Sequence, residues 1–296
     1  MKAVFLMNMG GARDEKELKQ FLFNMFSDKR IITSPIRYFL APIISNLRYK
    51  KVWQSYEMIG GSPIYKHTDN LINKLSQKID IPVFSVMRYT SPRADEIIKK
   101  HNITEAILFP LYPHYSTTTT ESSFDDVKGI KTIKIERFYK DKLFNEAVIE
   151  KIEESLKEWN DKEVNLIFSA HGLPQKIVDN GDSYEKEINE HIEILTKLLE
   201  KKGLNFKSIN LAYQSKVGPM KWLEPSLDDK LKEFKNEKVL VYPISFIIDN
   251  SETDLELGIE YAHQAEKVNI DYRVSKVVND SDKFVEFLVN KIEKLI

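Results

Sequence analysis

The sequence predicts an α/β protein with two four-stranded parallel sheets, each flanked by helices on both faces. Eight short apolar or β-branched runs alternate with longer stretches of helical spacing along 296 residues, and this alternation is typical of parallel sheets with crossover helices. Eight strands fit two sheets of four better than a single sheet. The runs expected to form strands are Lys2–Met7, Pro82–Met87, Ala106–Phe109, Thr132–Glu136, Val164–Ser169, Ser208–Tyr213, Lys238–Tyr242 and Ile270–Arg273.

Two of these strands run into glycine loops in a similar way, which suggests duplicated halves. The first strand continues into Asn8-Met9-Gly10-Gly11, and the fifth continues into Ala170-His171-Gly172. We therefore expect two domains, residues 1–160 and 161–296, which divide in the charged stretch Glu158–Glu163. The last helix is expected to pack back on the first domain.

Apolar residues at three- and four-residue spacing predict the helices. The clearest helical stretches are Asp14–Phe26, Phe144–Trp159, Tyr184–Leu199 and Ser281–Ile296. Phe26–Lys66 has no clear strand, so helical excursions over a site are expected there. Within it, Ile31–Lys51 is apolar with basic edges. This segment is either a lip that touches a membrane surface transiently or a helix packed on its own core.

Composition excludes several classes of protein. The chain has 44 basic and 45 acidic residues, so no basic excess points to nucleic acid. It has no cysteine, which excludes disulfides, thiolate metal sites and cysteine-ligated iron–sulfur clusters. The apolar run Ala3–Met7 is too short for a signal peptide, and nowhere do about 18 apolar residues run together. We therefore expect a cytoplasmic protein.

Residues that follow the apolar runs are the first candidates for a site, because ligands collect at the carboxyl ends of parallel strands. Met9 would be a soft apolar contact, Arg88 could meet an anionic substituent, and Tyr89 could pack on a flat ligand. The other interpretation is that these loops, together with Ile59–Ile64, are ordinary turns and helix caps.

A histidine and a row of carboxylates carry the strongest chemical signal. His171 ends a buried strand, while Glu252, Glu256 and Glu260 follow another strand at four-residue spacing, on one helix face. With Asp249, these groups suit a divalent first-row metal or an acid and a base on opposite sides of a substrate. Alternatively, the acidic row is only a helix N-terminus that favours negative charge.

Taken in order, these clusters resemble ferrochelatase, the enzyme that inserts Fe²⁺ into a porphyrin, over nearly the whole chain. The most specific matching segments are Phe168–Pro174, Tyr213–Leu223 and Asp249–Thr253. Ile59–Pro63 and Met87–Tyr89 support them.

The resemblance implies two similar Rossmann-like domains with a porphyrin cleft between them. It also implies that His171 and Glu252 are catalytic and contact the metal, with Glu256 and Asp249 as supporting groups. The positions expected near the macrocycle are Met9, Arg88, Tyr89, Tyr213, Ser215 and Trp222. Protoporphyrin IX is the expected substrate, converted to haem with release of two protons. Fe²⁺ is expected as a substrate, with no tightly bound cofactor and no iron–sulfur cluster, in a monomer.

The chain departs from the family pattern at two positions. Asn250 replaces a common histidine, and asparagine neither titrates near neutral pH nor binds metal as well. Gly258 replaces a usual aspartate, which thins the acidic face. Two other functions stay open: a non-catalytic tetrapyrrole carrier and a related chelatase for cobalt.

Overall fold

The structure is a computed structural model that describes residues 1–157, 159–216 and 218–296. Glu158, in the stretch where the sequence divides the domains, and Val217, inside a matching segment, lie outside the described residues. The chain folds into two compact units, Met1–Arg137 with Val285–Ile296, and Phe138–Phe284. The sequence places its domain boundary later, at residue 160.

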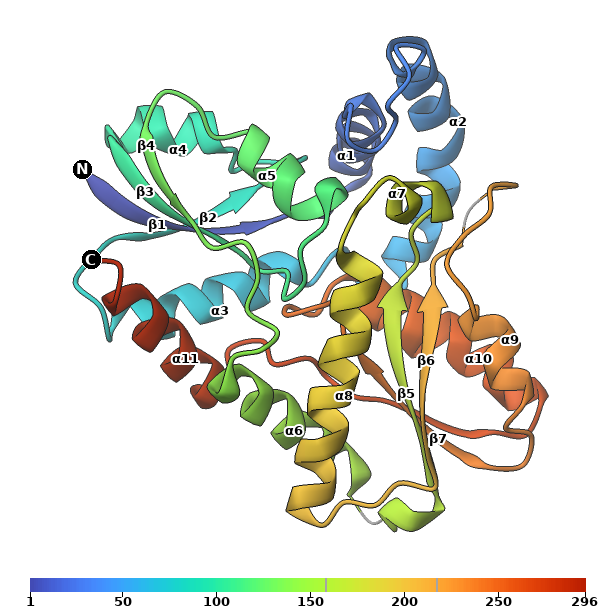
Figure 1. The fold of residues 1–296 in the computed structure, drawn as a ribbon. Helices are drawn as coiled ribbons and strands as arrows, with labels where there is room; N and C mark the ends of the chain where they lie inside the picture. The colour runs from blue at the N-terminus through green and yellow to red at the C-terminus, as the bar shows by residue number, and fades with distance from the viewer. Residues whose placement is uncertain (158, 217) are drawn as a thin grey trace. The chain divides into compact units, whose positions relative to one another are not determined.

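The first unit contains a four-stranded parallel sheet with the strand order β2-β1-β3-β4 (Figure 1). Its strands are β1 (Lys2–Asn8), β2 (Val83–Met87), β3 (Glu105–Pro110) and β4 (Lys131–Lys134). Its helices are α1 (Glu15–Ser27), α2 (Arg37–Glu57), α3 (Ile64–Ser76), α4 (Ala94–His101), the π-helix η1 (Thr117–Glu121) and α5 (Ser122–Asp125).

The second unit repeats this sheet with the order β6-β5-β7-β8. Its strands are β5 (Val164–His171), β6 (Ser208–Gln214), β7 (Lys238–Pro243) and β8 (Asp271–Val274). Its helices are α6 (Lys142–Leu156), the 3₁₀ turn η2 (Asp161–Glu163), α7 (Gln175–Asp179), α8 (Tyr184–Lys202), α9 (Leu227–Lys232), the π-helix η3 (Glu252–Glu260) and α10 (Tyr261–Lys267). The prediction of two four-stranded parallel sheets flanked by helices is confirmed.

The final helix, α11 (Asp282–Glu293), begins in the second unit, and the stretch from Val285 onwards belongs to the first. In the first unit, the Phe287 ring meets the Phe109 ring of β3 edge to face, with centroids 6.0 Å apart. Such edge-to-face pairs add to the burial of apolar surface.

The central strands of each sheet are apolar and buried, whereas the edge strands β4 and β8 are polar and partly exposed. In β1, Ala3 to Leu6 are completely buried, and in β5 the same holds for Leu166 to Phe168. Parallel strands covered by helices on both faces lose the alternation of polar and apolar residues, which is why continuous apolar runs identified them in the sequence.

The helix α2 occupies much of the interval for which the sequence predicts helical excursions. It packs against α1. Ala41 and Ser45 are buried, while Phe39 and Leu47 leave 75% and 76% of their surface exposed. The interpretation that this helix packs its apolar side chains on its own core is therefore wrong for these residues. In the part of the chain that the structure describes, no helix is long and apolar enough to cross a membrane.

Candidate functional site

The sheet of the second unit brings the predicted histidine to its carboxyl edge. His171 is the last residue of the central strand β5 and pairs in register with Gln214 at the end of β6. The next residue is Gly172, where an added Cβ would lie 2.7 Å from the Gln214 carbonyl oxygen and 3.3 Å from the Trp222 ring. Only glycine allows this close approach, so the strand ends with the His171 backbone held beside β6.

The His171 imidazole forms an ion pair with Glu252. The Nδ1 atom lies 2.7 Å from Glu252 Oε2, and 38% of the His171 side chain is exposed. Burial raises the pKa of Glu252, but the His171 charge and hydrogen bonds from His171, Ser215 and Gln214 outweigh it and lower the pKa. An ionised carboxylate only accepts hydrogen bonds, so Nδ1 donates. The lone pair of the neutral ring is then on Nε2.

The same contact makes His171 a stronger base. Burial by itself lowers the pKa of His171, but the charge and the hydrogen bond of Glu252 outweigh burial and raise the pKa above its ordinary value. The geometry is that of a carboxylate that orients a histidine for proton transfer through its other nitrogen.

Ser215 joins a second carboxylate to this pair. Its hydroxyl lies 2.6 Å from Glu256 Oε2 and 3.2 Å from Glu252 Oε2, and its backbone has a φ of 66°. Gln214 Nε2 also faces the two carboxylates, at 3.4 Å and 3.5 Å. Burial, followed by the Glu252 charge, raises the pKa of Glu256 to about 7. Glu256 therefore binds and releases protons near neutral pH, while Glu260 is exposed.

Two residues that sequence reasoning missed hold the histidine backbone. The Tyr184 hydroxyl donates to the His171 carbonyl oxygen at 3.0 Å, and Ser245 Oγ accepts from the His171 N–H at 3.3 Å. The two hydroxyls also contact each other at 2.6 Å. The sequence offered Tyr184 only as the first residue of a helix, so no local signal pointed to this role.

Asp249 and Asn250 differ from the row of carboxylates that the sequence predicts. The Asp249 carboxylate accepts a hydrogen bond from Asn279 Nδ2 at 2.8 Å and pairs with Lys276 at 3.5 Å, so its partners are different from those of Glu252. Asn250 Oδ1 accepts the Glu252 backbone N–H at 2.7 Å. Asparagine is well suited to such a cap, so position 250 acts on the backbone of η3.

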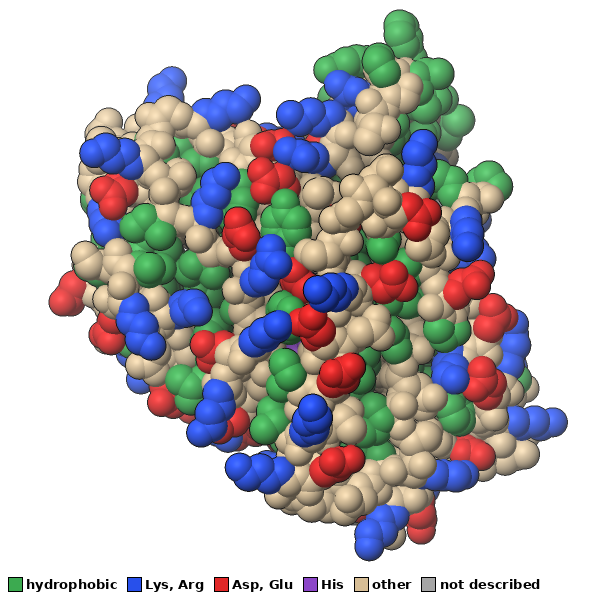
Figure 2. Space-filling model, viewed as in Figure 1, with side chains coloured by type: hydrophobic (Ala, Val, Ile, Leu, Met, Phe, Trp, Pro, Cys, Tyr) green, Lys and Arg blue, Asp and Glu red, His purple; other side chains and the backbone are tan. Residues whose placement is uncertain are grey.

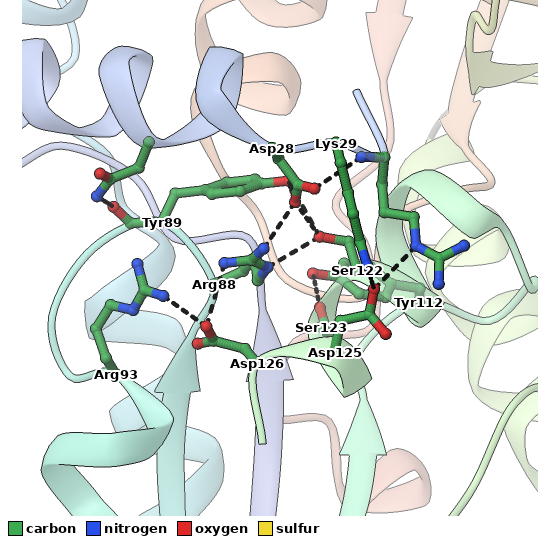
Figure 3. Close-up of polar contacts among 12 residues, drawn as sticks. Asp28, Lys29, Arg88, Tyr89, Arg93, Tyr112, Ser122, Ser123, Asp125 and Asp126 are labelled. Carbon is green, nitrogen blue, oxygen red and sulfur yellow. Dashed lines mark hydrogen bonds and ion pairs between the residues drawn. The ribbon is translucent and has the colours of Figure 1, made fainter. Parts of the chain in front are cut away.

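In the first unit, Arg88 forms ion pairs within the unit (Figure 3). Its guanidinium contacts Asp28 at 2.9 Å and Asp126 at 3.2 Å, and Nε donates to Ser122 Oγ at 2.9 Å. Tyr89 is completely buried, and its hydroxyl donates to Asp28 at 2.9 Å. The sequence predicts that Arg88 meets an anionic group and that Tyr89 packs on a flat ligand. In this structure Asp28 engages both side chains, and the contacts with a ligand stay predictions.

The other residues expected to contact the macrocycle differ in how exposed they are. Tyr213 is buried in the second unit. Met9 and Trp222 keep part of their surface exposed, and the backbone of Trp222 bridges to Pro174. Met9 and Trp222 thus keep the accessibility that a contact with a ligand needs.

Within residues 1–157, 159–216 and 218–296, no group of three or more His, Asp or Glu side chains is arranged to hold a metal ion. His171 and Glu252 form a pair of candidate ligands, one nitrogen and one oxygen.

Solved structures with the same fold define the class first. SirB from Bacillus subtilis, in a structure with Fe³⁺, aligns with a TM-score of 0.55 at 9% identity over 99% of this chain and 94% of its own. CbiX, the terminal enzyme for sirohaem biosynthesis in denitrifying bacteria, aligns with a TM-score of 0.54 at 9% identity over 99% of both chains. The chain thus shares the α/β fold of these two proteins.

Sequence relatives then identify the family. The ferrochelatase family model matches residues 1–295. Ferrochelatase of Nitratiruptor sp. is 48% identical over 100% of both chains, and that of Wolinella succinogenes is 49% identical over 99% of this chain and 98% of its own. The chain belongs to the ferrochelatase family. It is a metal chelatase, a lyase that inserts iron in haem biosynthesis.

Proposed function

We propose that the protein inserts Fe²⁺ into protoporphyrin IX at His171 and Glu252, and that haem and two protons are the products. The observation that carries the proposal is the His171 Nδ1 to Glu252 Oε2 contact of 2.7 Å at the carboxyl edge of the sheet. The contact orients the imidazole and raises the pKa of His171, and Ser215 joins it to Glu256. A binding module would not need this set of basic groups.

The reaction requires proton acceptors because Fe²⁺ replaces two protons on the inner nitrogens of the porphyrin. Neutral His171 can take one proton on Nε2, and Glu252 stabilises the resulting imidazolium. Glu256, with a pKa of about 7, can take a second proton and release it to water near neutral pH. The groups that accept protons are therefore matched to the pH of the reaction.

Before His171 takes a proton, the same pair can offer the incoming metal its first protein ligands. One imidazole nitrogen and one carboxylate oxygen are donors that suit Fe²⁺. Glu256 follows on the next turn of η3, with its carboxylate 2.6 Å from Ser215 Oγ. Met9 and Trp222, both partly exposed, are the proposed apolar contacts to the macrocycle.

Anaerobic turnover with protoporphyrin IX and coproporphyrin side by side tests the proposal. Loss of porphyrin fluorescence and growth of the haem absorbance should follow Fe²⁺ addition, faster with protoporphyrin IX. Binding of the porphyrin without metal insertion would instead show a tetrapyrrole carrier. Insertion of Co²⁺ in preference to Fe²⁺, when the two metals compete, would show a cobalt chelatase.

We also propose that α2 touches an anionic membrane surface transiently. Its exposed apolar side chains are Ile36, Tyr38, Phe39, Ile43 and Leu47. Figure 2 shows an apolar area at the top, in the region where α2 lies in Figure 1. Arg37 donates to the Thr33 and Ser34 carbonyl oxygens and to the Tyr38 hydroxyl, so its charge is not neutralised by them. In a cytoplasmic protein, such a patch would meet the anionic inner leaflet.

Flotation with vesicles tests this contact. The parent protein should bind phosphatidylglycerol vesicles more than phosphatidylcholine vesicles, and added salt should weaken binding. The double variant Phe39→Ser, Leu47→Ser should lose this binding, while Met220→Ser, an exposed apolar position in the second unit, should keep it. Equal flotation of all three proteins would contradict the proposal.

A further inference from the structure

Asn279 lies in the segment between β8 and α11 and forms hydrogen bonds with the chain just before η3. Its Oδ1 accepts the Asp249 backbone N–H at 2.8 Å, and its Nδ2 donates to Asp249 Oδ2 at 2.8 Å. Its own backbone N–H donates to the Ile247 carbonyl oxygen at 2.9 Å. One residue thus holds the stretch from Ile247 to Asp249 through three hydrogen bonds.

The backbone at Asn279 has a φ of 46°. This left-handed conformation is one that asparagine adopts more readily than most residues with a side chain. Asparagine therefore suits this position in two ways. It adopts the left-handed backbone conformation, and its amide both accepts the Asp249 N–H and donates to the Asp249 carboxylate.

Asp249 depends on this amide because it is buried. Its exposed fraction is 1%, and among the described residues its Oδ1 has no hydrogen-bond partner. Lys276, at 3.5 Å from Oδ2, is the charged group beside it. Loss of the Asn279 amide would leave a buried N–H and a buried carboxylate oxygen short of partners, which is costly, so the segment would shift to satisfy them.

The held segment leads directly to Glu252. Asn250 follows Asp249, its Oδ1 accepts the Glu252 N–H at 2.7 Å, and its carbonyl oxygen accepts the Asp254 N–H at 3.0 Å. The first turn of η3 is therefore attached to the residue next to the one that Asn279 holds. A shift at Asp249 would be carried to the Glu252 carboxylate, which must stay 2.7 Å from His171 Nδ1.

We propose that Asn279 is a positioning residue for metal insertion: by holding Asp249, it fixes the start of η3 and so places Glu252 against His171. Asn279 bonds to neither member of that pair. The inference rests on the proposed roles of His171 and Glu252.

Two variants separate the parts of this contact. Asn279→Gly removes the side chain but keeps the backbone N–H and the left-handed turn. Asn279→Asp keeps the acceptor for the Asp249 N–H but sets two carboxylates against each other. Each should lower kcat for iron insertion by about tenfold or more, as loss of a group that orients a ligand does, while KM for the porphyrin changes far less.

Exchanging the side chains of Asp249 and Asn279 is the sharpest test. In the double variant Asp249→Asn, Asn279→Asp, the amide and the carboxylate exchange places, and kcat should recover well above that of Asn279→Asp alone. No recovery, or a folded Asn279→Gly protein with parental kcat, would overturn the proposal.

A second measurement needs no substrate. Backbone amide exchange in residues 249–254 should be faster in Asn279→Gly than in the parent, with exchange in β5 and β7 unchanged. Unchanged exchange in residues 249–254 would also overturn the positioning role. A parent protein that inserts no iron would instead contradict the proposed function and leave this exchange comparison valid.

Discussion

The pairing of His171 with Glu252 joins residues that are 81 positions apart in sequence. Their residue types indicate metal or proton chemistry, but no local pattern states that Nδ1 meets Oε2. The pairing arises because β5 and β7 are neighbours in one parallel sheet, so the segments that follow them reach the same edge. The resemblance to ferrochelatase supplied the two residues, and the fold supplies the contact.

Arg88 and Tyr89 have partners within the protein that residue type does not predict. An arginine and a tyrosine after a strand suggest contacts to an anionic, flat ligand. In the structure, Asp28 accepts hydrogen bonds from both side chains and from Ser122 (Figure 3). Asp28 follows α1 directly, and nothing in the sequence around it predicts that it would meet a distant strand end.

Changing Glu252 should separate the catalytic carboxylate from the rest of its row. Glu252→Gln should lower kcat/KM for iron insertion by about a hundredfold, because the imidazole loses the charge that orients and activates it. Glu260→Gln, at an exposed position on the same helix, is the matched control and should keep nearly parental activity. Equal losses in the two variants would show that the acidic row is only a solvated helix face.

The pH profile of the Glu252→Gln variant tests whether His171 is the base. Transfer to Nε2 needs neutral His171, so kcat/KM should rise with pH through the pKa of His171. Glu252 raises that pKa and burial lowers it. Removal of the Glu252 charge should therefore move the acidic limb to lower pH. An acidic limb that stays in place would contradict the assignment of His171 as the base.

At the scale of elements, the strands were predictable and the π-helices were not. All eight predicted strands are present within a few residues of their expected ends. The buried central strands were the clearest, because strands covered on both faces need continuous apolar runs. The carboxylates at four-residue spacing indicate a helix, but spacing alone does not distinguish an α-helix from the π-helix η3.

The contact between α6 and α8 should make the second unit sensitive to acid. His191 on α8 is completely buried and bonds through Nε2 to Asn145 Oδ1 on α6 at 2.7 Å. Burial lowers the pKa of His191 to about 3. The unfolded chain binds this proton below about pH 6.5, while the folded chain does not until pH falls to about 3, so the neutral ring contributes stability above pH 6.5 that is lost as pH falls.

Between about pH 7.5 and pH 5, this histidine should lower the free energy of unfolding by about 2 kcal/mol. Urea denaturation at the two pH values measures the difference. His191→Gln should be less stable at neutral pH and show a smaller loss on acidification than the parent. His263→Gln, at an exposed position, should keep the parental pH dependence. An equal pH dependence in His191→Gln and the parent would contradict this account.

At the scale of the whole molecule, the two units repeat one plan. The strand orders β2-β1-β3-β4 and β6-β5-β7-β8 correspond position by position. The third strand of each ends in proline, Pro110 and Pro243, and a π-helix follows each, η1 and η3. The similar glycine loops of the sequence indicated this repeat only faintly, because sequence divergence removes side-chain similarity long before it changes strand order.

The corresponding edges of the two sheets carry different side chains. In the second unit, His171 and Glu252 lie at this edge, and Ser215 joins them to Glu256. In the first unit, the corresponding edge carries the Arg88–Asp28 network, which ties α1 to β2 and α5. One strand plan thus carries the His171–Glu252 pair in one unit and the Arg88–Asp28 pair in the other.

The most direct test of the central claim is anaerobic iron insertion by His171→Ala beside the parent protein. Porphyrin binding is followed by fluorescence titration and turnover by haem absorbance. We expect the variant to bind porphyrin as the parent does and to lose turnover by about a hundredfold or more, the usual contribution of a positioned base. A His171→Ala protein with near-parental turnover would contradict the claim that His171 and Glu252 carry the reaction.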